Sequence, residues 1–538
     1  MKRTLQVIGI LVAILILVIA TLPLLVNAND FRPRIQAELT KALGREVKVG
    51  DLKLALLSGG VTAADLSIAD DPAFSQSPFL RAKSLSVGVD LMPLIFSHKL
   101  NVTGITIEQP EIALLQSASG DWNFSGLGAS SQARAAPAAA STSTASSSAG
   151  LDLSIKSVKI ANGRVSLGKA KSSAQPLVFE KVNAEVRDFS AATVMPFTLT
   201  ANFSGGGQLK IDGTAGPIHS GDVTLTPAKV SLNVSHLDLA LAGVVDGATG
   251  MGGLISVDGS ATSDGKTVDV TGKIKAEQLK LVKGGSPAKK PVEFEFALLH
   301  DLKARSGTLK RGDVHIGNAA ASLIGTYTPK GEAPILSVTL SGPNMSIPEL
   351  EAMLPALNVV LPAGSSLQGG TATVHLSVEG PVDQLVATGS LGVNKTTLAG
   401  FDMGSKLSAL EKFAGMKGGP NTEIETLSTN VKASQAGGAA LDNIKLVEPS
   451  IGELSGAGTI SPANALDFKM TAIVHATGAL AAAGKMPIPV AVKGTASNPV
   501  FQPDVKAAAA QEIKGLTGGA AKTATGVLGG LLGNKPKK

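Results

Sequence analysis

The residue types that most often carry chemistry are present in this 538-residue chain, but they are scattered along it. Its seven histidines are His98, His219, His236, His300, His315, His375 and His475. No two have the spacing of a metal motif such as HExxH, and several fall in alternating segments where a histidine is an ordinary strand residue. Cysteine is absent, which excludes disulfides, thiolate ligands and a cysteine nucleophile. We expect neither a bound metal nor a cofactor.

Motifs for phosphate binding and for nucleophilic catalysis are also missing. The chain contains no GxxxxGK(S/T) loop and no GxSxG elbow. Gly205-Gly206-Gly207 is predicted to be a hairpin turn, because no helical pattern follows it. Asp70 and Asp71 directly precede Pro72, where a turn is far more common than an acid/base pair. We therefore predict no catalytic residues and expect that the protein is not an enzyme.

An uncharged apolar stretch at residues 5–26 is long enough to cross the hydrocarbon core of a bilayer, so we predict a transmembrane anchor there. Its anchor residues include Leu5, Ile10, Leu15, Ile19 and Leu25. The basic residues Lys2 and Arg3 precede it, so the N-terminus is expected to stay in the cytoplasm with the rest of the chain on the far side. The alternative is a signal peptide cleaved near Ala28, although its apolar region is longer than is usual for one.

Charge and composition narrow the class of ligand. The net charge is +6, with Lys and Arg dispersed rather than clustered, which argues against nucleic acid as a partner. Aromatic residues make up only 3% of the chain while apolar residues make up 44%, so its interior must be aliphatic. Such surfaces suit acyl chains better than bases or sugars, although for any single strand an ordinary aliphatic core is the more common explanation.

Three short helices are predicted. Residues 31–43 place apolar side chains on one helical face, and Gly44 follows as a stop. Ser346 and Glu349 have the spacing of a capping box that opens a second helix. Leu407, Leu410 and Phe413 mark a third, which is expected to end at Gly415.

Elsewhere apolar residues recur at every second position, which predicts strands with one apolar and one wet face. The clearest apolar faces are Leu85, Val87, Val89 and Leu91, then Ile105 and Ile107, then Val374, Leu376 and Val378. Further strands are predicted at residues 153–158, 160–165, 196–203, 208–213, 229–241, 267–276, 291–299, 313–328 and 336–340. Residues 424–431, 444–447, 452–460 and 466–474 are expected to form a meander, followed by a strand at 488–494.

These patterns divide the chain into six segments. The predicted boundaries are 1–29 (cytoplasmic tip and anchor), 30–128 (first β region), 129–150 (Ala/Ser-rich linker), 151–345 (central sheet), 346–505 (last β domain) and 506–538 (Ala/Gly/Lys-rich tail). The linker lacks the apolar periodicity of a packed segment and is predicted to be disordered. The fold class is mainly β, with a transmembrane helix followed by an elongated, curved antiparallel sheet and a few short helices.

Segments near both ends resemble the AsmA family. The N-terminal ones are IQAELTKALGREV at 35–47, VTGITIEQPEI at 102–112 and DWNF at 121–124. The C-terminal ones are GFDM at 400–403, LVEP at 446–449, GAGTI at 456–460 and IPVAVKGTASNP at 488–499. The match is motif-based at the ends and rests on strand pattern alone in the middle. These motifs are structural, so they identify a family better than an activity.

The resemblance implies a single-pass protein of a bacterial inner membrane with its bulk in the periplasm. The family is similar to chorein-type bridge-like lipid transfer proteins, in which a long sheet forms an apolar groove. The implied role is outer-membrane biogenesis by phospholipid transport, with the inner membrane bilayer, phospholipid and envelope proteins as partners. The nine residues of the clearest apolar faces are then the candidate groove lining. The alternative is a scaffold or regulator of outer-membrane protein assembly that carries no lipid.

Overall fold

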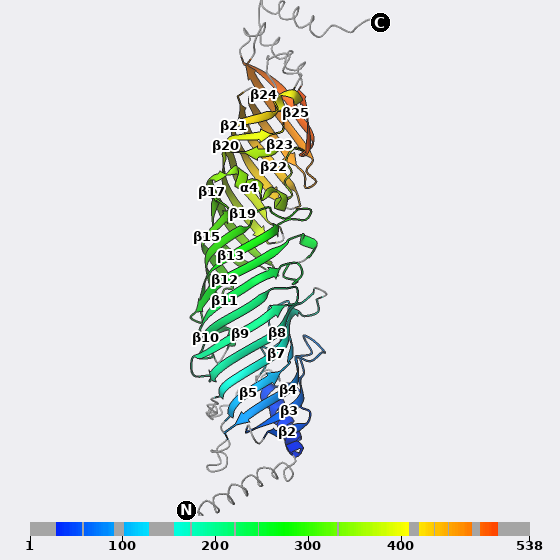
Figure 1. Ribbon diagram of the computed structural model, residues 1–538, viewed down its shortest axis with the longest axis vertical. Helices are drawn as coiled ribbons and strands as arrows, with labels where there is room; N and C mark the ends of the chain where they lie inside the picture. The colour runs from blue at the N-terminus through cyan, green and yellow to red at the C-terminus, as the bar shows by residue number, and fades with distance from the viewer. Residues whose placement is uncertain are drawn as a thin grey trace, which may run out of the picture. The chain divides into compact units, whose positions relative to one another are not determined.

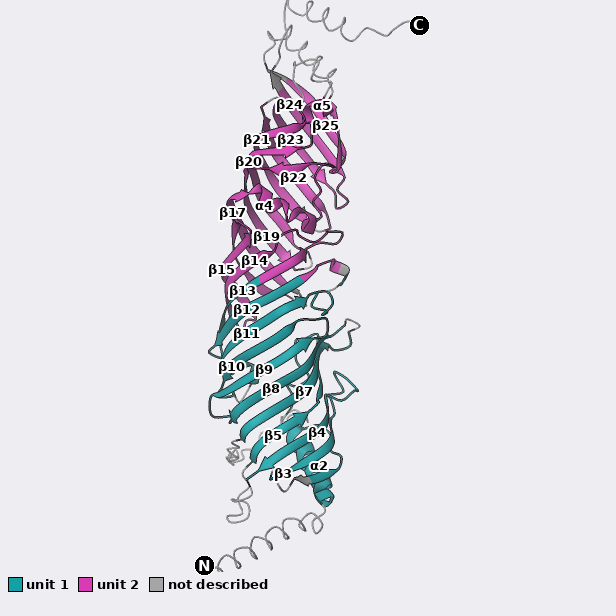
Figure 2. Cartoon of the chain, viewed as in Figure 1, with its two compact units in different colours: residues 1–247, 254–274, 300–303 teal, residues 248–253, 275–299, 304–538 magenta. Residues whose placement is uncertain are grey.

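The computed structural model describes residues 28–503 apart from 56–58, 91–101, 128–154, 173–174, 220–221, 246, 331–332, 383, 408–418, 435, 450 and 476–484. Within these residues the chain is mainly β, with 26 strands and a few short helices (Figure 1). It divides into two compact units, which Figure 2 colours separately. The first contains residues 1–247, 254–274 and 300–303, and the second contains 248–253, 275–299 and 304–538.

The first unit begins with the predicted amphipathic helix. After the 3₁₀ turn η1 (Ala28–Phe31), helix α2 (Arg32–Leu43) ends at Gly44 in the left-handed conformation, as predicted. Its strands are β1 (Val47–Lys48), β2 (Leu52–Ala55), β3 (Gly60–Ile68), β4 (Leu80–Val89), β5 (Val102–Glu108), β6 (Glu111–Gln116), β7 (Ile155–Lys169), β8 (Leu177–Phe189), β9 (Met195–Phe203), β10 (Gln208–Ala215) and β11 (Ala228–Asp238). The short turns η3 (Val223–Leu225) and η4 (Gly247–Thr249) lie beside β11 in the sequence.

Three strands carry residues of both units, namely β12 (Gly252–Ser263), β13 (Thr267–Lys280) and β14 (Val292–Asp301). The second unit continues with β15 (Ser306–Ile316), β16 (Ala319–Lys330), β17 (Ala333–Ser346), β18 (Ser366–Gln368), β19 (Thr371–Pro381), β20 (Val386–Ala399), β21 (Asn421–Ser434), β22 (Gly438–Glu448), β23 (Gly452–Ile460), β24 (Leu466–His475), β25 (Lys485–Thr495) and β26 (Asn498–Pro503). Its helical turns are α4 (Ile347–Glu351), η5 (Leu354–Leu357) and α5 (Met403–Lys406).

Strand pairing is mostly antiparallel between neighbours in the chain, as predicted, with one exception in the first unit. Strands β7 to β12 form a meander, but β7 pairs in parallel with both β5 and β6. Parallel strands need a long crossover connection. Residues 117–154, which include the Ala/Ser-rich segment, lie between β6 and β7 in the sequence. Because of these two parallel pairs, the sheet is mixed. In the second unit every pairing from β15 to β26 is antiparallel.

Bulges keep the apolar side chains on one face of these long strands. At His236, which has a positive φ of 51°, the register of β11 shifts between Val234 and Leu237. A bulge adds one residue to one strand, so the residues after it change face relative to strict alternation. Val234 and Leu237 consequently both enter one buried cluster, although they are three positions apart. Asn443 does the same in β22, between Leu441 and Ile444.

Several predicted elements need correction. The single strand expected at 313–328 is the hairpin β15–β16, because Gly317 turns the chain with a φ of 54°. Ser346 does precede α4, but its side chain makes no cap hydrogen bond; Glu349 instead accepts one from Lys290 Nζ at 2.5 Å. Strands β3, β6, β8, β12, β18, β20 and β26 were not predicted. The expected helix beyond Leu407 lies outside the described residues, as does the 129–150 linker.

None of the helices in the described part of the chain has the length and apolarity that crossing a bilayer requires. The predicted anchor with Leu5, Ile10, Leu15, Ile19 and Leu25 precedes the first described residue. The anchor, the six segment boundaries and the membrane orientation remain predictions.

Candidate functional site

The most extensive apolar feature of the first unit is a pair of cross-strand rows on one face of its sheet. Each row joins residues that are directly opposite each other on the paired strands β3, β4, β5 and β7 to β12. Row 1 is Val61, Val87, Ile105, Val158, Val186, Phe197, Gly213, Val230 and Ala261. Row 2 is Ala63, Leu85, Ile107, Ile160, Ala184, Leu199, Ile211, Leu232 and Gly259. Except for the buried Ala63, these residues are half-buried.

The opposite face of the same strands is polar. The row between rows 1 and 2 consists of Thr62, Ser86, Thr106, Lys159, Glu185, Thr198, Asp212, Ser231 and Ser260. Lys159 Nζ lies 3.3 Å from a Glu185 carboxylate oxygen, and the Ser157 hydroxyl donates to the same carboxylate at 3.1 Å. These hydrogen bonds hold the pKa of Glu185 below its ordinary value. The charged groups of this face therefore remain ionised in water, and the face does not need to be covered by another layer.

The second unit repeats the arrangement. Row 3 is Leu323, Leu340, Leu376, Gly389, Val431, Leu441, Gly458, Phe468, Val492 and Phe501. Row 4 is Leu309, Gly325, Val338, Val378, Ala387, Ala433, Ala439, Ile460 and Leu466. On the reverse face Ser322, Ser341, His375, Ser390, Asn430 and Asp442 form a polar row.

Parts of these faces are covered and parts are not. Around α2, the buried residues Val47, Val49, Leu52, Leu66 and Phe79 form a filled cluster with their neighbours. The helix supplies its partly buried Ile35, Leu39 and Leu43. We define the open face of the first unit as row 1 from Val87 to Val230 with row 2 from Ile160 to Ile211. None of its members belongs to any of the four buried clusters of described residues.

The candidate lining residues fall into distinct environments. Leu85 and Ile107 face each other on row 2 and pack against the filled cluster around α2. Val87 and Ile105 begin the open face, and Val89 follows at the end of β4. Val374, Leu376 and Val378 lie on β19 in the second unit, half-buried and in three neighbouring rows. Leu91 lies outside the described residues.

The sequence pattern missed most of the open face. Val158 and Phe197 lie in strands that were predicted, but no local pattern specifies the register that places them in one row with Ile105. Val186 and Ala184 lie on β8, which was not predicted because Lys181, with a φ of 50°, marks a bulge that interrupts its alternation. The alternation of apolar residues on each side of that bulge was the signal from which β8 could have been predicted.

A buried polar network fixes the filled cluster. Arg45, just after α2, pairs with Asp70 through an Nη1–Oδ1 distance of 3.0 Å, and their side chains are 7% and 0% exposed. Asn123 Nδ2 donates to Asp70 Oδ2 at 2.8 Å and to the Ala113 carbonyl at 2.8 Å. Arg45 Nη2 also donates to the Asn123 carbonyl. The predicted turn is confirmed, since the Phe74 amide donates to the Asp71 carbonyl at 2.9 Å. The network joins the α2–β1 connection, this turn after β3 and the segment containing Trp122, so Asp70 has a structural role.

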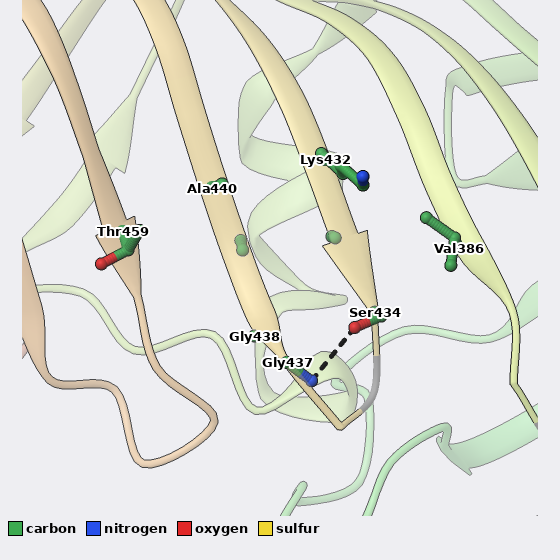
Figure 3. Close-up of a pocket in the computed structure, with 9 residues that line it drawn as sticks. Val386, Lys432, Ser434, Gly437, Gly438, Ala440 and Thr459 are labelled. Carbon is green, nitrogen blue, oxygen red and sulfur yellow. Dashed lines mark hydrogen bonds between the residues drawn. The ribbon is translucent and has the colours of Figure 1, made fainter.

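A further concave feature of the described residues lies in the second unit. A depression of about 220 Å³ at the ends of β20 to β23 is lined by Val386, Lys432, Thr459 and small residues (Figure 3). Its one hydrogen bond in that view runs from the Gly437 amide to Ser434 Oγ at 3.0 Å. No group of three or more acidic or histidine side chains among the described residues could hold a metal ion.

Comparison with known proteins agrees with the sequence motifs at the N-terminal end. A family model described as AsmA family matches residues 1–274, which is half of the chain and includes the open face of the first unit. No significant match was found among curated proteins or among solved structures. The family motifs at 35–47, 102–112 and 121–124 lie within the match, and those from 400 onward lie beyond it. The chain belongs to the AsmA family.

Proposed function

We propose that this protein binds the acyl chains of phospholipid along the apolar faces of its sheets and in this way supports outer-membrane biogenesis. Family membership suggests a role in the cell envelope. The observation that carries the lipid-binding step is the open face of the first unit. Its aliphatic side chains are half-buried. In this unit the described strands mainly contact the strands with which they pair, and α2 and η1 contact each other, β1 and β2.

The dimensions of this face suit acyl chains. Strands lie about 4.8 Å apart. Row 1 from Val87 to Val230 crosses the seven strands β4, β5 and β7 to β11 and therefore spans about 29 Å. One leaflet of a bilayer core is about 15 Å thick, so two acyl chains could lie end to end across the row. Each methylene removed from water contributes about 0.8 kcal/mol. Affinity then needs no specific polar contact, in keeping with the lack of a polar constellation in the sequence. In this proposal residues 5–26 anchor the chain in the inner membrane.

The alternative is a scaffold for outer-membrane protein assembly that carries no lipid. The filled clusters support it, because Leu407, Ile488 and Ala472 are fully buried at the end of the second unit in the manner of an ordinary core. A scaffold needs only such cores and a solvated surface. The two proposals therefore differ in whether the open face contacts lipid.

The test is photolabelling of the full-length protein in vesicles that contain phosphatidylethanolamine with a diazirine in one acyl chain. Mass spectrometry then locates the label. We expect labels on the open face and about a tenfold loss there in Val230→Asp, because a carboxylate disfavours an acyl chain beside it. The matched control is Ser231→Asp, which adds the same charge on the polar face of the same strand. Equal labelling of the two variants, or labels confined to residues 5–26 in the wild type, would support the scaffold.

A further inference from the structure

Four of the aromatic rings lie across a glycine of the neighbouring strand. Phe197 faces Gly213, Tyr327 faces Gly307 and Phe468 faces Gly458 in direct cross-strand pairs. Phe294 of β14 covers Gly312 of β15. A methyl group added to Gly213 would lie 3.0 and 3.1 Å from two atoms of the Phe197 ring, and one on Gly312 would lie 2.8 Å from Phe294 Cε2.

At Gly307 the Tyr327 ring alone explains why the residue is glycine. A methyl group on Gly307 would lie 2.6 Å from the Tyr327 hydroxyl oxygen and closer still to ring atoms Cε1 and Cζ. No backbone atom is among its three nearest neighbours, whereas at Gly213 and Gly458 a carbonyl oxygen also crowds the site. The φ of Gly307 is not positive, so its backbone conformation does not require glycine. The residue must be small because the ring occupies the space of its side chain.

Side chains on a sheet normally stand roughly perpendicular to it, so a tyrosine or phenylalanine would project well above its aliphatic neighbours. An opposing glycine lets the ring lean over and cover the neighbouring backbone. Glycine within a strand lowers stability, so its use at these positions needs a compensating benefit. Rings that lie flat keep the apolar face level.

We infer that the ring-and-glycine pairs of Phe197, Phe294 and Tyr327 are positioning residues for the ligand, keeping the apolar face level so that a flexible unbranched acyl chain can lie across the strands. The Phe468 pair has a structural role, because Phe468 packs against the buried cluster that contains Leu407, Ile488 and Ala472. This inference rests on the proposed function. It identifies the ligand class as an extended hydrocarbon chain, because a level face has no pocket for a rigid ring system.

Tyr327 provides an independent spectroscopic readout, because it is the only tyrosine in the chain. It is half-buried, next to Leu336 in its row, and desolvation raises its pKa above the ordinary value of 10.0. Lifting the ring off Gly307 would expose the phenol to water. The pKa, measured by absorbance near the phenolate band, should then fall towards its ordinary value.

The experiment uses three variants of the full-length protein in the same diazirine-phosphatidylethanolamine vesicles. Gly307→Ala should lower labelling of row 4 beside Tyr327 about fivefold, since the displaced ring stands in the path of the chain. Gly307→Ala with Tyr327→Leu should restore it, because the clash is gone. Gly392→Ala is the control: a methyl there meets nothing closer than 3.9 Å, and it lies on the polar face.

Each outcome decides the inference. Loss in Gly307→Ala with a lowered Tyr327 pKa, and recovery in the double variant, supports it. Unchanged labelling in a folded Gly307→Ala protein overturns it, as does a loss that the double variant fails to restore. If the wild type takes no label outside residues 5–26, the proposed function itself fails and this inference with it. The Tyr327 titration still distinguishes that case, because the ring would move without any effect on lipid.

Discussion

Two leucines on the same row of the first unit have different surroundings. Leu85 and Leu199 both belong to row 2, on the same face of one sheet, and both are half-buried. Leu85 packs against the filled cluster to which α2 contributes, whereas Leu199 belongs to none of the clusters of described residues. The same alternation thus forms a core where other elements cover the sheet, and an open apolar face where no described element covers it.

The largest effect is expected from breaking the network that holds the filled end together. Asp70→Ala would leave the Arg45 guanidinium buried without its partner, which costs about 3–5 kcal/mol of unfolding free energy. Trp122 is the only tryptophan and lies next to Asn123 of this network, so its fluorescence during denaturant unfolding reports on this end. The control is Asp51→Ala, which removes an exposed partner 3.7 Å from Arg32 and should change stability by less than about 0.5 kcal/mol. Equal effects would show that the network does not stabilise this end.

The direct test of the comparison is the same substitution at both leucines. Leu85→Ala should destabilise the protein by about 2 kcal/mol, because it leaves a gap beside the filled cluster. Leu199→Ala should cost about 1 kcal/mol or less, since Leu199 belongs to no buried cluster of the described residues. Acyl-chain photolabelling near β9 should fall about threefold in Leu199→Ala, which removes methyl and methylene contacts with the ligand. Denaturation and labelling should therefore rank the two variants in opposite orders, and a common ranking would contradict the distinction.

The smallest effect concerns pH. Desolvation raises the pKa of Tyr327, so the folded protein favours the protonated phenol. Its contribution to stability is complete below the ordinary value of 10.0 and is lost as the pH rises through the folded pKa, because the unfolded chain releases the proton first. The loss should be less than about 1 kcal/mol, because the group is only partly buried. Tyr327→Phe should remove this part of the alkaline decline while leaving the titration of lysines unchanged, which unfolding curves at several pH values would reveal.

Local patterns in the sequence determined the elements and their two faces. The spacing of Ile35, Leu39 and Leu43 with Gly44 predicted α2, and the alternation at Leu376 and Val378 predicted β19 and its apolar side. The sequence also contains the family motifs, and it lacks the GxxxxGK(S/T) and GxSxG motifs. Each of these depends on residues a few positions apart, where helix and strand periods act directly.

Only the tertiary structure decided in which register the strands pair, which parts of the sheet are covered and where the aromatic rings lie. Val158 meets Ile105 in parallel across a long connection, and no local pattern specifies that partner. Leu85 and Leu199 have equivalent sequence contexts, and their difference depends on where α2 and the first strands pack. Tyr327 lies over Gly307 from 20 positions away, and no local pattern around Gly307 predicts this contact. Burial and pairing are properties of non-local contacts, so the alternation of a strand predicts its apolar face without predicting what covers it.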